Sequence, residues 1–225
     1  MNLDLLKEIK DLDSISISYL QRNHSMGYVL ATKVFKELVD TGVISSDGSV
    51  NKERICQELG ETYERGVKIV FLDIDGVLNC ETTKECCGPY IGIDDNKVSL
   101  LKQIVDQTGA KIVLVSSWKL WWTNNPRHKK YQDELANYLD EKFRKQGLSI
   151  VDKTNEYSPY NRGDGILEYL RYVKHMGITV DKFIIIDDEM FDYKQTKLTP
   201  NLIQTSFYKQ GLETKHVKRA IDKLI

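Results

Sequence analysis

Hydrophobic and polar positions follow two alternating patterns from residue 67 onward. Short apolar runs occur in KIVFLDID (68–75), KIVLVSS (111–117), LSIVD (148–152) and KFIIIDD (182–188). Between these runs, apolar residues recur at helical spacing over 97–108, 130–146 and 164–176. Continuous apolar strands separated by helices predict a parallel sheet that is covered on both faces. We therefore expect an α/β fold whose ligands bind at the carboxyl ends of the strands.

The first 62 residues have helical spacing without such runs. Helices are expected over 3–12, 16–23 and 27–41. The string SSDGS, residues 45–49, predicts a tight turn at the tip of a two-stranded wing. Residues 60–66 are short and polar, so we place a junction there, between a small helical module over 1–62 and an α/β domain over 67–225. A chain of 225 residues suits that division.

Composition excludes some classes of protein. The net charge of −1 argues against nonspecific binding of polyanions by the whole chain. No apolar stretch approaches the roughly 20 residues that a membrane span needs, and the first residues do not resemble a signal peptide. We expect a soluble, cytoplasmic protein with no membrane partner. The cysteines lack CxxC spacing and a nearby histidine pair, so reduced thiols are expected rather than a zinc site, at Cys56, Cys80, Cys86 and Cys87.

Polar residues that can carry chemistry stand at the ends of the predicted strands. In chain order they are Asp73 and Asp75, Ser116, Arg162, and Asp187 with Asp188. A phosphate ester is anionic, so an enzyme that cleaves it must neutralise its oxygens and hold an attacking atom in line. Crowded carboxylates stay ionised together only beside a cation, and a hard divalent ion with oxygen ligands, Mg²⁺, fits this set. Singly, each motif could be a helix cap, a turn or a surface charge; together they favour an active site.

The order and chemistry of these motifs resemble the haloacid dehalogenase (HAD) superfamily of phosphohydrolases over residues 67–225. The strings FLDIDGVLN, IVLVSSW and FIIIDDE, with Arg162 ahead of a helix, are most similar to the HAD domain of Swiss Army Knife RNA-repair proteins. The resemblance implies a Rossmann-like HAD fold and an aspartyl-phosphate mechanism. Asp75 places the chain with the phosphatases, because dehalogenating relatives lack that carboxylate and the transport ATPases have threonine there.

The resemblance also implies a role for each residue. Asp73 would be the nucleophile, and Asp75 the general acid and base with a raised pKa. Ser116 would donate a hydrogen bond to the phosphoryl group, and Arg162 would balance its charge, with Lys153 as the competing candidate. The Mg²⁺ ligands would be the Asp73 side chain, the Asp75 backbone carbonyl and Asp187, with Asp188 in support.

Substrate access is expected to be open, because the spacing leaves no room for an inserted cap domain. Asp73 and Ser116 are 43 positions apart, which a flap over 77–93 and one helix already fill. An open site suits a large substrate, such as the phosphorylated end of a nucleic acid or a phosphoprotein, although a small nucleotide also fits.

Aromatic residues follow the second motif. Ser117, Trp118, Trp121 and Trp122 are candidate substrate-binding residues, because indole rings at the mouth of the site could stack on bases. The alternative is that these rings pack the loop against the next helix. A basic run over 127–130 could meet a phosphate backbone.

The N-terminal module is similar to the gamma domain of FtsK-type DNA translocases, on the strings over 16–18, 20–22, 27–28 and 42–44. The resemblance implies a winged helix that binds duplex DNA, with Arg22, Tyr28 and Lys33 as nucleic-acid-binding residues. Val29 and Leu30 depart from it, because apolar side chains cannot make bidentate contacts with bases. Residues 1–66 also hold eight Lys or Arg against eleven Asp or Glu. Docking to a protein partner, or dimerisation, is therefore an equal alternative.

A noncatalytic regulator remains the second hypothesis for the whole chain. In that case the winged helix would bind DNA or protein and the HAD fold would be a scaffold. Asp73 and Asp75 favour the enzyme, because a scaffold does not need neighbouring carboxylates that repel each other.

Overall fold

The computed structural model describes residues 2–61, 66–130, 132–155 and 161–225. The chain divides into two compact units, Met1–Arg65 and Gly66–Ile225. Each unit has its own hydrophobic core and is described separately. No helix in the described residues is long and apolar enough to cross a membrane.

Four helices form the N-terminal unit: α1 (Leu3–Ile9), α2 (Ile17–Asn23), α3 (Tyr28–Asp40) and α4 (Lys52–Leu59). The first three lie where helical spacing predicts them, and the side chains of Asn2 and Ser16 cap α1 and α2. The apolar pattern does not predict α4, because Ile55 is its only buried residue. Residue types typical of helix ends do mark its boundaries: Asn51 caps its start, and Gly60 follows its end in the left-handed conformation.

The turn expected over 45–49 is present. Ser45 N donates to Ser49 O at 2.8 Å, and Gly48 N donates to Ser45 O at 2.9 Å. Ile44 and Val50 form an isolated antiparallel bridge beside this turn. Among the described residues of this unit, strand pairing is limited to isolated bridges. The winged helix therefore stays a prediction.

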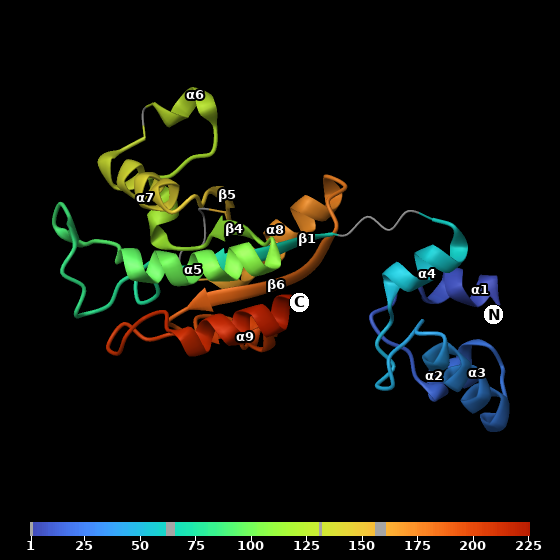
Figure 1. Ribbon diagram of the computed structural model, residues 1–225. Helices are drawn as coiled ribbons and strands as arrows, with labels where there is room; N and C mark the ends of the chain where they lie inside the picture. The colour runs from blue at the N-terminus through green and yellow to red at the C-terminus, as the bar shows by residue number, and fades with distance from the viewer. Residues whose placement is uncertain (1, 62–65, 131, 156–160) are drawn as a thin grey trace. The chain divides into compact units, whose positions relative to one another are not determined.

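A five-stranded parallel sheet forms the centre of the second unit (Figure 1). Its spatial order is β5 (Ile150–Lys153), β4 (Lys111–Leu114), β1 (Val67–Leu72), β6 (Val180–Asp187) and β7 (Leu202–Gln204). The parallel sheet inferred from the apolar runs is confirmed. The short edge strand β7 was not predicted, because three residues show no recognisable period.

Helices cover both faces of this sheet, as expected. Alternate residues of β1 point to opposite faces: Val70 and Leu72 join one hydrophobic cluster, and Ile69 and Phe71 join another. Helices α5 (Asp95–Thr108), α7 (Glu134–Lys145) and α9 (Thr214–Leu224) contribute to the first cluster, and α8 (Arg162–His175) contributes to the second.

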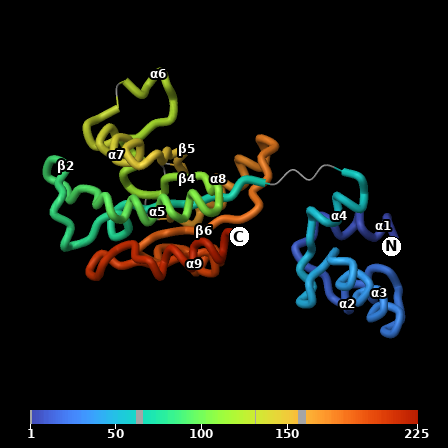
Figure 2. Tube along the Cα trace, viewed as in Figure 1, coloured from blue at the N-terminus to red at the C-terminus, as the bar shows by residue number. Residues whose placement is uncertain are grey.

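At the carboxyl ends of the strands, the described connections to the following long helices contain only short elements. A small antiparallel hairpin, β2 (Cys86–Cys87) with β3 (Tyr90–Ile91), lies between β1 and α5. Figure 2 shows it at the end of the unit toward which β1 and β6 run. After β4 come a 3₁₀ turn, η1 (Ser117–Leu120), and the short helix α6 (Pro126–Lys129). No inserted cap domain occurs in these described segments, which agrees with the spacing argument.

Candidate active site

The loop after β1 places two aspartates differently. Asp73 continues the strand, since its N–H donates to Ile186 O at 2.9 Å, and its side chain is buried. Asp75 is exposed to a cavity. The turn between them and the next segment requires glycine: Gly76 has φ of 69°, and a Cβ there would collide with the Asp188 carboxylate.

Three carboxylates meet at the ends of β1 and β6. One oxygen each from Asp73, Asp187 and Asp188 lies within 4.8 Å of the others. Burial, together with the nearby charge of Asp73, raises the pKa of Asp187 to about 7 and that of Asp188 to about 6. Asp73 Oδ1 is buried and has no hydrogen-bond donor among the described residues. A buried, unpaired carboxylate oxygen within such a set fits a hard divalent cation.

Arg162 is the counter-charge of this cluster. Its Nη1 lies 2.8 Å from Asp73 Oδ2 and 2.6 Å from Asp187 Oδ2. Its guanidinium also stacks on the ring of Phe191, with the carbon atom 4.1 Å from the ring centroid. Although burial disfavours its charge, the two carboxylates raise the pKa of Arg162, so it is always protonated.

The start of α8 holds Arg162 in place. Arg162 is the first residue of this helix, and its N-cap, Asn161, makes no capping bond through its side chain. Asp192 caps the helix instead: its carboxylate accepts hydrogen bonds from Gly163 N at 2.7 Å and Asp164 N at 3.0 Å. The loop after β6 thus fixes the helix that carries the arginine.

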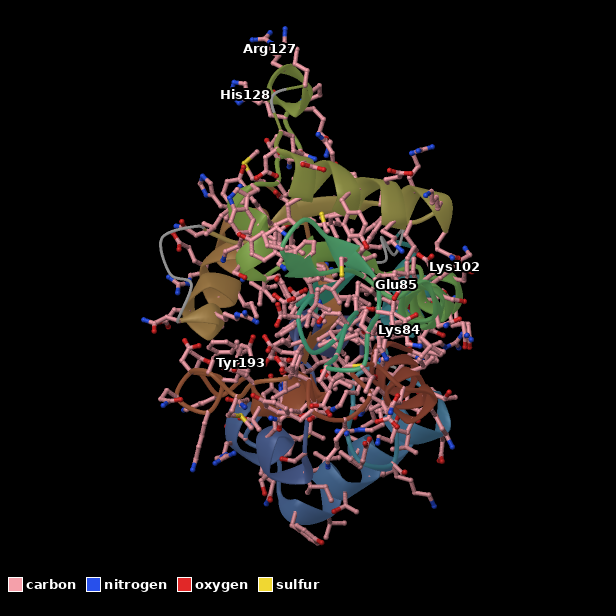
Figure 3. The ribbon with its side chains drawn as sticks, turned by 90° about the vertical axis from the view of Figure 1, so that its left-hand side faces the viewer. Lys84, Glu85, Lys102, Arg127, His128 and Tyr193 are labelled. Carbon is pink, nitrogen blue, oxygen red and sulfur yellow. The ribbon has the colours of Figure 1, made fainter. Side chains whose placement is uncertain are left out.

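Asp187 is held by two further donors. Tyr193 Oη donates to its Oδ2 at 2.8 Å, and Glu189 N donates to its Oδ1 at 3.0 Å. Tyr193, labelled in Figure 3, is fully buried in the segment after β6. Sequence reasoning missed it, because a tyrosine in an irregular segment gives no signal of its partner.

Ser116 and Lys153 lie at the carboxyl ends of β4 and β5, and Arg162 lies at the start of α8. Val115 N donates to Leu72 O at 2.9 Å, so Ser116 follows β4 at the edge where Asp73 follows β1. Of the two cations, only Arg162 forms an ion pair with Asp73. Lys153 Nζ instead donates to the carbonyls of Lys119 and Trp122, both at 2.8 Å.

Lys119 is a buried cation that the sequence did not single out. Its Nζ donates to Thr154 Oγ1 at 3.0 Å and to Asn155 O at 2.8 Å. Burial lowers the pKa of Lys119 to about 8, and the positive charges of Arg162 and Lys153 act in the same direction.

The three tryptophans lie in different environments. Trp118 and Trp122 are buried, and their indole N–H groups donate to Asp75 Oδ2 at 3.0 Å and Asp140 Oδ1 at 2.8 Å. Neither ring is open to a base. Trp121 is 39% exposed and lies beside Tyr90 of the hairpin, with ring centroids 6.4 Å apart. Ser117 is exposed at the start of η1.

A cavity of about 280 Å³ contains the acidic residues. It is lined by Asp73, Asp75, Arg162, Asp188, Glu189, Phe191, Phe207 and Tyr208. Phe207 and Tyr208 pack edge to face, with centroids 5.4 Å apart, and Tyr208 is 78% exposed. They follow β7, the strand that was not predicted, which is why the sequence did not point to them. A larger cavity beside β5, of about 400 Å³, contains none of the clustered carboxylates.

The candidate residues of the N-terminal unit lie on its surface. Arg22 and Lys33 are exposed on α2 and α3. Tyr28, Val29 and Leu30, the first turn of α3, are 65%, 83% and 52% exposed. The surface at the start of α3 is therefore apolar.

A parallel sheet that carries a DxD loop after its central strand and an acidic pair at the end of the neighbouring strand defines a HAD-type domain. This chain belongs to the family of HAD domains in Swiss Army Knife RNA repair proteins, whose profile matches residues 69–217. The match begins after the N-terminal unit and so leaves its resemblance to the FtsK gamma domain untested.

Among solved structures, the chain is similar to a protein from Mesorhizobium loti whose crystal structure is described as that of a HAD-like phosphatase. The two are 12% identical, with a TM-score of 0.44, and the alignment covers 73% of this chain and 89% of the other. No curated protein sequence matches this chain.

Proposed function

We propose that the second unit is a Mg²⁺-dependent phosphomonoester hydrolase that works through an aspartyl-phosphate on Asp73. The observation that carries this proposal is the convergence of Asp73, Asp187 and Asp188 within 4.8 Å, with Arg162 paired to the buried Asp73. Such a group of charges is costly to a fold that makes no use of it.

The first step is transfer of the phosphoryl group to the enzyme. An Asp73 carboxylate oxygen attacks phosphorus, and the bond between phosphorus and the leaving oxygen breaks. Asp75 gives its proton to that oxygen. Although Asp75 opens onto the cavity, the surrounding protein removes part of its solvent and so raises its pKa. Hydrogen bonds from Asn79 and Trp118 oppose this shift, but the carboxyl is still protonated more readily than an ordinary aspartate.

The second step returns the enzyme to its starting state. Asp75, now a carboxylate, takes a proton from water as the water oxygen attacks phosphorus. The bond between phosphorus and the Asp73 oxygen breaks, and inorganic phosphate leaves. Arg162 offsets the negative charge of the phosphoryl group, and Ser116 donates a hydrogen bond to one of its oxygens.

Mg²⁺ would be held by the side chains of Asp73, Asp187 and Asp188 and by the backbone carbonyl of Asp75. The oxygen ligands, and the unpaired Asp73 Oδ1 among the described residues, suit this ion. When bound, it supplies positive charge that lets the carboxylates and a phosphate share one cavity.

The substrate class that we propose is a phosphorylated nucleic-acid end or a nucleotide. Phe191, Phe207 and Tyr208 line the cavity that holds Asp73, and aromatic rings bind bases by stacking, at about 1–3 kcal/mol per base. Figure 3 shows Arg127 and His128 projecting from α6, where the charge of Arg127 is placed to meet a phosphate backbone. The RNA repair proteins that give the family its description are consistent with this class.

Release of phosphate from p-nitrophenyl phosphate and from phosphorylated oligonucleotides tests the proposal. We expect turnover with Mg²⁺, none above background in excess EDTA, and none for Asp73→Asn. Acid quenching during turnover of labelled substrate should trap phosphate on the parent chain. Full turnover by Asp73→Asn would rule out Asp73 as the nucleophile, and no turnover by the parent would favour the noncatalytic scaffold.

For the N-terminal unit, we propose docking to a protein partner. The exposed apolar turn of Tyr28, Val29 and Leu30 favours a protein surface over base edges in a groove. Titration of the full chain with duplex DNA at two salt concentrations tests this. Salt-dependent affinity that is weakened in Arg22→Ala/Lys33→Ala would overturn protein docking and favour DNA.

A further inference from the structure

Both carboxylate oxygens of Asp75 are held by side chains from other parts of the chain. Asn79 Nδ2 donates to Oδ1 at 2.8 Å, and Trp118 Nε1 donates to Oδ2 at 3.0 Å. The carboxylate is otherwise exposed to the cavity. One donor per oxygen fixes the rotation of the group and leaves its other lone pairs free to face a ligand.

The Asn79 donor is itself fixed. Asn79 is fully buried, and its Oδ1 accepts a hydrogen bond from Gly76 N at 2.9 Å. Because the amide oxygen must face this N–H, the amide nitrogen must face Asp75. The same nitrogen also donates to Ile91 O of the hairpin at 3.4 Å.

The Trp118 donor is fixed by packing. Trp118 is 4% exposed and belongs to the hydrophobic cluster that also contains Leu72 and Leu114. Its backbone N–H donates to Ser116 Oγ at 3.4 Å, at the start of η1. The indole therefore reaches Asp75 from the segment that follows β4.

We propose that Trp118, together with Asn79, is a positioning residue that aims the Asp75 carboxyl at the leaving-group oxygen of the substrate. The inference rests on the proposed function, because it assumes that Asp75 is the general acid. A general acid must lie within hydrogen-bond reach of the atom that it protonates, and a displacement of about 1 Å can cost roughly 10²-fold in rate.

This role predicts a dependence on the leaving group that a merely structural role does not. An alkyl phosphate releases a basic alkoxide, so its cleavage needs a proton from Asp75. A 2,4-dinitrophenyl phosphate releases a weakly basic phenolate, which departs without one. The ratio of kcat/KM for the two substrates therefore measures how well Asp75 is placed, because kcat/KM covers the steps up to departure of the leaving group.

The test compares the parent with Trp118→Phe in the full chain with Mg²⁺. Phenylalanine keeps an aromatic ring and removes the N–H. We expect kcat/KM to fall at least about tenfold for the alkyl phosphate and less than about threefold for the dinitrophenyl ester, within the roughly 10²–10⁴-fold that acid catalysis contributes. An equal loss on both substrates, or no loss on either, would overturn the proposal.

Trp122→Phe is the matched control. It also removes a buried indole N–H from an aspartate, since Trp122 donates to Asp140 at 2.8 Å. We expect this control to leave the ratio of the two substrates unchanged. If Trp118→Phe does not fold, benzothienylalanine at position 118 keeps the shape of the indole and replaces the N–H with sulfur, and the same change in ratio is expected.

Failure of the proposed function is distinguishable from failure of this inference. Asp75→Asn should give a larger leaving-group effect than Trp118→Phe. If Asp75→Asn shows no such effect, Asp75 is not the general acid and the positioning role falls with it. If Asp75→Asn shows the effect and Trp118→Phe does not, the general acid stands and the role of Trp118 is overturned.

Discussion

The Nη1 atom of Arg162 lies 2.8 Å from Asp73 Oδ2, and both side chains are buried. The same nitrogen also lies 2.6 Å from Asp187 Oδ2. One cation thus separates two carboxylates that would otherwise repel each other. In the metal-free protein, this arginine is the main source of positive charge in contact with the cluster.

Replacing Arg162 by methionine should therefore destabilise the metal-free second unit. Two buried carboxylates lose their partner, and breaking a buried pair in this way costs about 3–5 kcal/mol. All three tryptophans lie between residues 118 and 122, so denaturant unfolding followed by tryptophan fluorescence in EDTA reports on this unit alone. Arg162→Lys keeps the positive charge and should lower the free energy of unfolding by less. A methionine variant as stable as the parent would show that the pair contributes nothing.

The position of the acidic cluster could be predicted because, in a parallel sheet, residues at the ends of different strands lie close together in space. Carboxyl ends of parallel strands meet at one edge, so Asp73 after β1 and Asp187 at the end of β6 had to be near each other once the apolar runs were recognised as strands. The same rule placed Ser116 beside them. It needs only the pattern of the strands and no knowledge of side-chain packing.

Residues outside the regular elements could not be found in this way. Tyr193 and Phe207 lie in irregular segments that follow β6 and β7, and no periodicity connects them to the cluster. Trp118 illustrates a second limit. An indole beside a predicted site suits both an exposed stacking ring and a buried hydrogen-bond donor, and only the packing of η1 against the core decides between them.

Mg²⁺ binding should strengthen as pH rises through the range in which the cluster loses its protons. The pKa of Asp187 is raised to about 7 and that of Asp188 to about 6, chiefly by burial. Protons compete with the metal for these oxygens. We expect the increase in Tm caused by Mg²⁺ to be larger at pH 7.5 than at pH 5.5. An increase that does not depend on pH would contradict this assignment of the ligands.

Without metal, the same shifts predict the opposite trend. A carboxyl whose pKa is higher in the folded than in the unfolded state binds more protons when folded. Its contribution to stability is present below the unfolded value of 3.8 and is lost as pH rises through about 6 to 7. In EDTA, Tm should therefore fall across this range. Asp188→Asn removes one of the two groups and should make the fall smaller.

Lys119 should produce a rise in stability at alkaline pH. Its pKa is about 8 in the folded state, against an ordinary value of 10.5. Between these values the folded protein has lost this proton and the unfolded chain has kept it, so stability rises with pH. At about 1.4 kcal/mol per pKa unit, the contribution is at most about 3.5 kcal/mol, and less where solvent screens the charge. Denaturant unfolding in EDTA from pH 7.5 to 10.5 measures it.

Lys119→Met isolates this effect from other groups that titrate in the same range. The variant should lack the rise that Lys119 causes, and the difference between parent and variant should grow from pH 8 to 10.5. Lys111→Met, at an exposed lysine at the start of β4, controls for the loss of one positive charge. Parallel pH profiles for the parent and Lys119→Met would show that the buried lysine is not desolvated as its surroundings indicate.

The aromatic lining of the cavity should select the group that carries the phosphate. Phe207 and Tyr208 stand beside Asp73 and Asp75, and a ring stacked on a base is worth about 1–3 kcal/mol, or roughly 5- to 150-fold in kcat/KM. Tyr208→Ala should therefore lower kcat/KM for a phosphorylated oligonucleotide by such a factor and leave that for a small alkyl phosphate within about twofold. Tyr172→Ala, at a tyrosine that is 56% exposed and lies outside this cavity, should change neither. Equal effects of Tyr208→Ala on both substrates would mean that the ring supports the loop and makes no contact with a base.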